Sequence, residues 1–88
     1  MVYIIYGITD CPACLKAQAH LMEKDIQYVF VQMDFSKSYR DSLKEEFLWD
    51  TFPIIIKLDA SGEELIGGFH ELYMDLECDD LSPEHRPT

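Results

Sequence analysis

Residues 2–14, VYIIYGITDCPAC, decide how the rest of this chain is interpreted. The apolar run at 2–6 predicts a buried β-strand, and the residues after it predict a loop. Two cysteines three positions apart follow, and a helical pattern behind them predicts a helix over 12–24. Cys11 is therefore expected at the N-terminus of that helix. Pro12 then takes the first helical position, where a missing N–H costs nothing.

A thiol at a helix N-terminus is well placed for redox chemistry. Unpaired backbone N–H groups and the positive end of the helix dipole stabilise a thiolate there, and the thiolate is the nucleophile of thiol–disulfide exchange. Asp10, directly before Cys11, opposes this effect because a neighbouring negative charge disfavours a thiolate. We therefore expect a moderate stabilisation of the Cys11 thiolate, with Cys14 one helical turn away as its redox partner.

Two structural interpretations of the cysteine pair are weaker. A disulfide between Cys11 and Cys14 would close a loop of about four residues, which restricts the unfolded chain little. A zinc site needs four ligands, usually from a second cysteine pair or a histidine cluster. The other candidate ligands are scattered singly along the chain: Cys78, His20, His70 and His85. We expect no metal, a solvated His20 on its helix, and a free or partly buried thiol at Cys78.

The composition indicates one soluble globular domain. The chain has 88 residues, and 48% of them are hydrophobic, which suffices for a modest single core. No signal peptide or membrane-spanning run is visible, so we expect a cytoplasmic protein, in which a cysteine pair is more often transient than structural.

The chain is strongly acidic. Its formal net charge is −10, from 17 acidic against 7 basic residues. Such a field repels nucleic acid and anionic membrane surfaces, and we exclude both as partners. The acidic surface either steers encounters with a basic face of a partner protein or only keeps the domain soluble.

Strand and helix patterns alternate along the rest of the chain. The elements expected are a strand at 28–33, a helix at 37–49 with Ser36 as its N-cap, a strand at 53–58, a hairpin turn, a short strand at 63–66, and a helix from near Phe69. The apolar stripes predicted for the first and last helices are Leu15, Ala19, Met22 and Ile26, and Leu72, Tyr73 and Leu76. This βαβ, α, ββ, α order predicts an α/β fold with a mixed four-stranded sheet.

Three motifs in this order make the chain resemble the glutaredoxins. They are Cys11-Pro12-Ala13-Cys14, Thr51-Phe52-Pro53 before the third strand, and Gly67-Gly68-Phe69-His70-Glu71-Leu72 after the fourth. The match covers roughly residues 2–78. The resemblance implies a thioredoxin-like fold with three flanking helices and a glutaredoxin domain at 1–79. The polar residues after it predict a disordered C-terminal tail at 80–88. The resemblance also implies a glutathione-linked thiol–disulfide oxidoreductase with a cis peptide bond before Pro53.

The resemblance assigns roles to individual residues. Cys11 is the nucleophile that attacks a disulfide sulfur, and Cys14, or an incoming glutathione, resolves the mixed disulfide. The residues that the resemblance places on glutathione are Thr51, Phe52 and Pro53 on one wall of its groove, and Gly68, Phe69 and His70 at its γ-glutamyl end. Backbone N–H groups at a helix N-terminus suit that carboxylate. Tyr6 either borders the site or is a core residue.

Glutathione is the partner and reductant that the resemblance implies. The other partners are client proteins that contain disulfides, with ribonucleotide reductase as one client suggested by analogy. We expect a monomer.

The chain departs from the family pattern close to the expected site. Ala13 stands where glutaredoxins most often carry an aromatic residue, which removes a contact surface beside the nucleophile. Asp50 stands where many relatives carry a basic or amide residue, so its charge should weaken the binding of anionic glutathione. The basic residues that can compensate are Arg40, Lys44 and Lys16.

Three other functions remain open. One is a glutaredoxin-like electron donor recharged by thioredoxin reductase, which fits Gly68-Phe69 and the acidic Asp50. A second is an iron–sulfur carrier that holds a cluster through Cys11 and glutathione, which Pro12 and Cys14 disfavour because the relatives with that role mainly lack both. The third is an adaptor with vestigial thiols.

Overall fold

The computed structural model describes residues 1–80, with residues 78–80 described by their backbone alone, so the predicted thiol of Cys78 lies outside the described side chains. The segment at 81–88, with His85 and nearly all of the predicted tail, lies outside the described residues. The elements are β1 (Val2–Gly7), α1 (Pro12–Glu23), β2 (Tyr28–Gln32), α2 (Lys37–Phe47), β3 (Ile54–Asp59), β4 (Gly62–Gly67) and α3 (Phe69–Asp80). The predicted element order and the α/β class are confirmed. No helix within residues 1–80 is long and apolar enough to cross a membrane.

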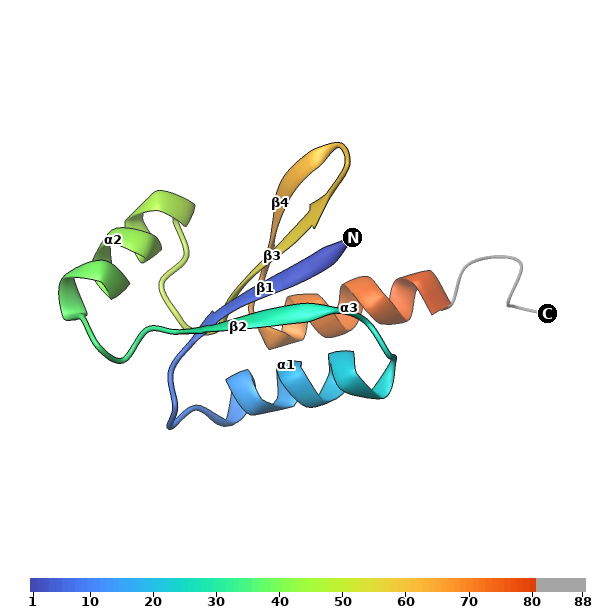
Figure 1. Ribbon diagram of the computed structural model, residues 1–88, viewed down its shortest axis with the longest axis horizontal. Helices are drawn as coiled ribbons and strands as arrows, with labels where there is room; N and C mark the ends of the chain where they lie inside the picture. The colour runs from blue at the N-terminus through green and yellow to red at the C-terminus, as the bar shows by residue number, and fades with distance from the viewer. Residues whose placement is uncertain (81–88) are drawn as a thin grey trace.

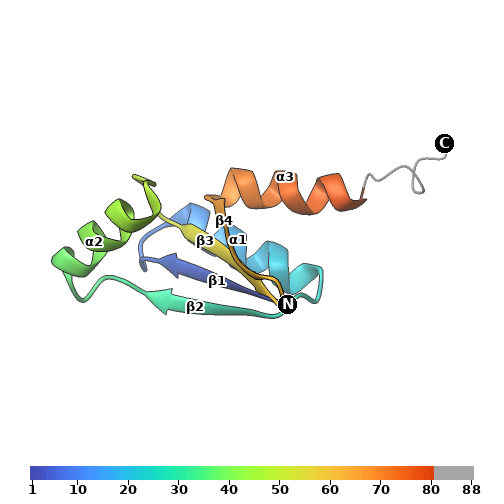
Figure 2. The same ribbon diagram turned by 90° about the horizontal axis from the view of Figure 1, so that it is seen from above.

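The four strands form one mixed sheet in the order β2-β1-β3-β4. β1 pairs with β2 in parallel and with β3 in antiparallel orientation, and β3 and β4 form the predicted hairpin. α1 and α3 lie side by side along the sheet, while α2 lies apart from them (Figures 1 and 2). This topology brings the loop after β1, the loop before β3 and the start of α3 close to the N-terminus of α1.

Alternating residues of β1 divide the core into two clusters. Tyr3 and Ile5 are buried against α1 and α3, whereas Ile4 and Tyr6 pack on the other cluster, as the period of two in a strand requires. The first cluster also contains Ala17, Leu21, Ile55, Leu72 and Leu76. The second contains Met33, Leu43, Ile54 and Ile56. Both faces of the central strands are therefore covered, which explains their nearly continuous apolar sequence.

The apolar stripe predicted for α1 is wrong. Its buried residues are Cys14, Ala17 and Leu21, and only Ile26, beyond the helix, packs against the core as predicted. The exposed members of the predicted stripe are Leu15, Ala19 and Met22. α1 carries apolar residues on more than one face, so periodicity alone could not choose between them. The face that turns the second cysteine inward is the one buried.

His20 is another correction, because its side chain is only 12% exposed. Its ring lies between α1 and α3, with ring centroids 6.2 Å from Phe69 and 5.2 Å from Tyr73, and its Nε2 is 3.5 Å from a carboxylate oxygen of Glu77. Tyr73, predicted to be on the buried face of α3, is 43% exposed and covers His20 instead. The contact depends on packing between two helices far apart in sequence.

Ser36 is the N-cap of α2, as predicted. Its hydroxyl accepts a hydrogen bond from the backbone N–H of Tyr39 at 3.2 Å. α2 ends at Phe47, two residues earlier than predicted, because Leu48 adopts a left-handed conformation with φ 54°. The chain then turns towards the segment that precedes β3.

Candidate functional site

Cys11 is the N-cap residue of α1, as the sequence predicts. Its Sγ accepts a hydrogen bond from the backbone N–H of Cys14 at 3.1 Å, and Pro12 begins the helix. The sulfur therefore faces the unpaired amides of the first turn, where negative charge is stabilised. Cys11 is partly exposed, so a substrate can reach it. This is the position that a nucleophilic thiol requires.

Cys14 is fully buried beneath the loop that follows β1. A Cβ on Gly7 would lie 2.8 Å from its Sγ, so no larger residue fits there without movement. Burial is the main cause that raises the pKa of Cys14 to about 12, and its hydrogen bond with Cys11 acts in the same direction. A hydrogen bond from the backbone of Ile8 opposes them. Cys14 therefore remains a thiol at neutral pH, in contact with the more accessible Cys11.

The loop before β3 forms a wall beside the first cysteine. The Phe52-Pro53 peptide bond is cis, as the family resemblance implied. The Sγ of Cys11 lies 3.9 Å from the carbonyl oxygen of Phe52, so this backbone does reach the thiol. Pro53 is buried and Thr51 is exposed. The structure therefore brings all three residues of the predicted wall to the edge of the thiol site.

The N-terminus of α3 holds the other three residues predicted to bind glutathione. Gly68 is buried, Phe69 is half-buried against the core, and His70 is exposed. The backbone N–H of Gly68 donates a hydrogen bond to Oε1 of Glu71 at 3.0 Å, which is half of a capping box. The Gly68 amide is thus already satisfied by the chain's own carboxylate. A carboxylate of a ligand bound at this helix end would have to accept hydrogen bonds from other backbone amides.

Trp49 is a residue near the site that the sequence analysis missed. Its ring lies 2.9 Å from where a Cβ on Gly67 would be, and its Nε1 lies 3.8 Å from the corresponding position on Gly68. Trp49 therefore joins the end of α2 to the start of α3. Its Nε1 is buried and has no hydrogen-bond partner within residues 1–80. The available signal was that the single tryptophan of the chain stands two residues before Thr51.

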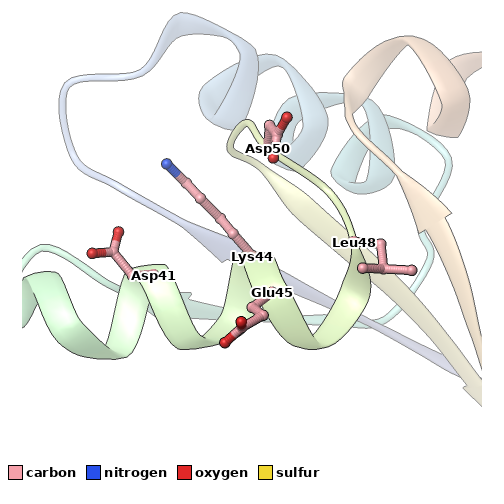
Figure 3. A pocket seen from close by; sticks show the side chains of 5 residues that line it. All are labelled: Asp41, Lys44, Glu45, Leu48 and Asp50. Carbon is pink, nitrogen blue, oxygen red and sulfur yellow. The ribbon is translucent and has the colours of Figure 1, made fainter.

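Lys44 is the basic residue that the structure places beside the predicted groove. Its Nζ lies 5.3 Å from the centroid of the Phe52 ring, a cation–π contact. It also lines an open pocket of about 470 Å³ together with Asp41, Glu45, Leu48 and Asp50 (Figure 3). The Lys44 side chain extends from α2 on the side where the loop with Asp50 lies. Three carboxylates share this pocket with one ammonium group.

Arg40 does not serve as a second cation for the groove. Its guanidinium donates hydrogen bonds to the carbonyl oxygens of Met33 and Asp34, at 3.0 and 2.8 Å, and is held at the start of α2. Lys16 is exposed on α1. Tyr6 belongs to the second core cluster, with its ring centroid 6.4 Å from that of Phe47. Of the basic residues considered, Lys44 thus has a described contact with the Thr51–Pro53 wall.

Metal-ligating side chains do not gather in the described part of the chain. No group of three or more His, Cys, Asp or Glu residues there is arranged to hold a metal ion.

Comparison with known proteins gives one family and several similar structures. Residues 3–59 match the family model described as Glutaredoxin. The solution structure of glutaredoxin from Brucella melitensis is 25% identical, with a TM-score of 0.71 over 100% of this chain and 95% of that one. Glutaredoxin 1 from Francisella tularensis, complexed with cacodylate, is 24% identical, with a TM-score of 0.71 over 89% and 94% of the two chains.

A plant structure shares the fold. The buckwheat glutaredoxin–glutathione complex has a TM-score of 0.73 over 92% of this chain and 73% of that one, at 17% identity. No curated protein sequence matches the chain.

Proposed function

Because this chain belongs to the glutaredoxin family of thiol–disulfide oxidoreductases, we propose that it reduces protein disulfides or glutathione mixed disulfides with glutathione as the reductant. In this proposal Cys11 is the nucleophile and Cys14 the resolving thiol. The observation that carries it is the position of the Cys11 sulfur. It caps α1, accepts the Cys14 amide and lies against the carbonyl of Phe52.

The first step uses the thiolate of Cys11. It attacks one sulfur of a client disulfide, the client S–S bond breaks, and a mixed disulfide between Cys11 and the client forms. The departing client sulfur leaves as a thiolate and takes up a proton. The helix N-terminus lowers the free energy of the attacking thiolate. The carbonyl of Phe52 offers a backbone hydrogen-bond acceptor beside the attacked sulfur.

The second step uses Cys14. It loses its proton and attacks the Sγ of Cys11, the mixed disulfide breaks, and a Cys11–Cys14 disulfide forms as the second client thiolate leaves. The client gains two electrons and the protein loses two. In the reduced protein, burial and the hydrogen bond with Cys11 keep Cys14 protonated, so the loss of its proton is a required part of this step. Two glutathione molecules then restore the dithiol and leave as glutathione disulfide.

Glutathione would lie along the wall made by Thr51, Phe52 and Pro53, with its γ-glutamyl end towards α3. In support of this, the wall lies beside Cys11, and the buckwheat relative of the same fold was solved with glutathione. Lys44 supplies a positive charge beside Phe52 for the anionic peptide. We further propose that Asp50 limits this affinity, since its carboxylate lines the same pocket as Lys44.

One observation favours a second candidate function. The Gly68 amide at the α3 N-terminus is occupied by Glu71, and three carboxylates line the pocket beside the wall. Both features disfavour an anionic ligand. A glutaredoxin-like donor recharged by thioredoxin reductase would not need a strong glutathione site, so it is the alternative to test.

A pair of coupled assays separates the two candidates. NADPH oxidation is followed with a small mixed-disulfide substrate, once with glutathione and glutathione reductase and once with thioredoxin reductase. Turnover only with glutathione, abolished in Cys11→Ser, is the expected result. Retained turnover in Cys14→Ser would reveal a route that needs one thiol. Turnover only with thioredoxin reductase would replace the proposed function by the second candidate.

A further inference from the structure

The loop between β1 and α1 is tied to the end of β2 by one carboxylate. Oδ1 of Asp34 accepts the backbone N–H of Thr9 at 3.1 Å, and Oδ2 accepts the Thr9 hydroxyl at 2.8 Å. The neighbouring backbone N–H of Met33 donates to the carbonyl oxygen of Gly7 at 2.7 Å. The Thr9 N–H also donates to Oδ2 at 3.2 Å, so four hydrogen bonds hold the 7–9 segment, although 25 residues separate Thr9 from Asp34.

The backbone that carries this carboxylate is held in place from α2. Arg40 donates from one nitrogen to the carbonyl oxygens of both Met33 and Asp34. The bonds from Thr9 are the main cause that lowers the pKa of Asp34, so this exposed side chain is ionised at neutral pH. A charged acceptor makes stronger hydrogen bonds than a neutral one.

The segment that Asp34 holds contacts the buried thiol of Cys14 and leads directly to Cys11. Gly7 packs directly against the Sγ of Cys14, and the backbone of Ile8 hydrogen-bonds the Cys14 side chain. Cys11 follows Thr9 by two residues and begins α1. In sequence, Thr9 therefore lies between the residues that contact Cys14 and the helix cap formed by Cys11.

We propose that Asp34 is a positioning residue of the thiol site, which acts by holding Thr9. The Asp34–Thr9 pair keeps the Ile8 backbone on Cys14 and keeps Cys11 at the helix N-terminus. The roles of the two thiols rest on the proposed function. In-line attack of one sulfur on another depends on their relative placement, and small misplacements of reacting groups cost large factors in rate.

The chain contains a matched control for this pair. Asp59 accepts the backbone N–H and the hydroxyl of Ser61 at 2.9 and 2.7 Å, in the β3–β4 hairpin. Its pKa is lowered for the same reason as that of Asp34. Asp59→Ala therefore removes an equivalent surface arrangement that touches neither cysteine.

The test measures how fast the two thiols react with each other. Reduced protein is mixed with bis(2-hydroxyethyl) disulfide, and acid-quenched samples are analysed by mass spectrometry. Cys11 attacks this neutral disulfide and releases one mercaptoethanol. Cys14 then displaces the second mercaptoethanol and forms the Cys11–Cys14 disulfide. The rate constants of both steps are obtained without glutathione or any coupling enzyme. A failure of glutathione-dependent turnover in the coupled assays therefore remains distinguishable from a failure of this inference.

Asp34→Ala and Thr9→Val are each expected to slow formation of the Cys11–Cys14 disulfide by about tenfold or more. Their double variant should be hardly slower than either single one, because the pair acts as a unit. Thr9→Ser keeps the hydroxyl and should restore the rate, and Asp59→Ala should match the unaltered protein. Thr9→Val serves the test if Asp34→Ala does not fold. Disulfide formation in both variants within about twofold of Asp59→Ala, with only the melting temperature changed, would overturn the proposal.

Discussion

The Sγ of Cys11 lies 3.9 Å from the backbone carbonyl oxygen of Phe52, although the two residues are 41 positions apart in sequence. One belongs to the start of α1 and the other to the segment before β3. β1 and β3 are antiparallel neighbours. The loop that leaves β1 and the segment that enters β3 therefore lie at the same end of the sheet. The thiol of Cys11 thus lies beside a backbone hydrogen-bond acceptor from a distant part of the chain.

The two thiols of the site should react very differently with alkylating reagents. At pH 7, iodoacetamide is expected to label Cys11 while leaving Cys14 unlabelled, because burial raises the pKa of Cys14 to about 12. The measurement is mass spectrometry of tryptic peptides in a Cys78→Ser background. Denaturation in urea should make both cysteines equally reactive. Equal labelling of the native protein would contradict the structural description of Cys14.

Removal of the Lys44 charge should weaken glutathione binding. Lys44→Met keeps the length of the stem over Phe52 but deletes the ammonium, so KM for glutathione should rise by about two- to fivefold with kcat little changed. The difference should shrink at high salt, because charges near the surface are screened. Lys57→Met is the control, since Lys57 lies on β3 with its Nζ 4.0 Å from a carboxylate oxygen of Asp75 and does not line this pocket. Equal changes of KM in the two variants would show that Lys44 does not contact glutathione.

Two glycines with nearly the same φ should tolerate alanine differently. Gly62 and Gly67 have φ values of 126° and 124°, so the strain of adding a Cβ is similar at both. Nothing lies within 4 Å of a Cβ on Gly62, whereas one on Gly67 meets Trp49 and Glu71 at 2.9 Å. Gly67→Ala should therefore cost about 1–3 kcal/mol more unfolding free energy than Gly62→Ala, measured by urea denaturation. Similar losses of unfolding free energy would mean that Trp49 and Glu71 move aside without a measurable cost.

The ionised carboxylate of Asp59 should contribute to the pH dependence of conformational stability. Its hydrogen bonds from Ser61 lower its pKa in the folded state below the ordinary aspartate value of about 3.9. The stabilisation is therefore present above that value and is lost as the pH falls through the lower, folded pKa. Melting temperatures from pH 6 to pH 2 should fall more steeply for the unaltered protein than for Asp59→Asn. Parallel curves would show that the bonds do not depend on charge.

The order of elements could be predicted because local signals were consistent. Ser36 marks the start of α2, and the Asp59–Gly62 turn marks the hairpin. The buried face of α1 could not be predicted, because apolar side chains occur all around that helix. His20 was misjudged for a related reason, since its partners Phe69 and Tyr73 belong to α3. Both errors concern which helices pack together, information that no local pattern contains.

The candidate site was predictable to the extent that motifs mark it. Cys11 is an N-cap, and the peptide bond before Pro53 is cis, as expected. Trp49 and Asp34 were missed because neither belongs to a motif. Their contacts join segments far apart in the chain, the first to Gly67 and the second to Thr9. Single side chains that link loops in this way become visible only when the strands are placed next to one another.

In the proposed mechanism, the sulfur of Cys11 is the group that reacts, and in the reduced protein the same sulfur caps α1. Oxidation to the Cys11–Cys14 disulfide changes the bonding of this sulfur. Conformational stability and redox state are therefore thermodynamically linked. The difference in unfolding free energy between the dithiol and disulfide forms equals the difference in reduction free energy between the folded and unfolded cysteine pair. A better cap for the thiolate makes the folded pair a weaker reductant. Denaturation curves of the two forms therefore measure how far folding has tuned the electron-donating strength of this site.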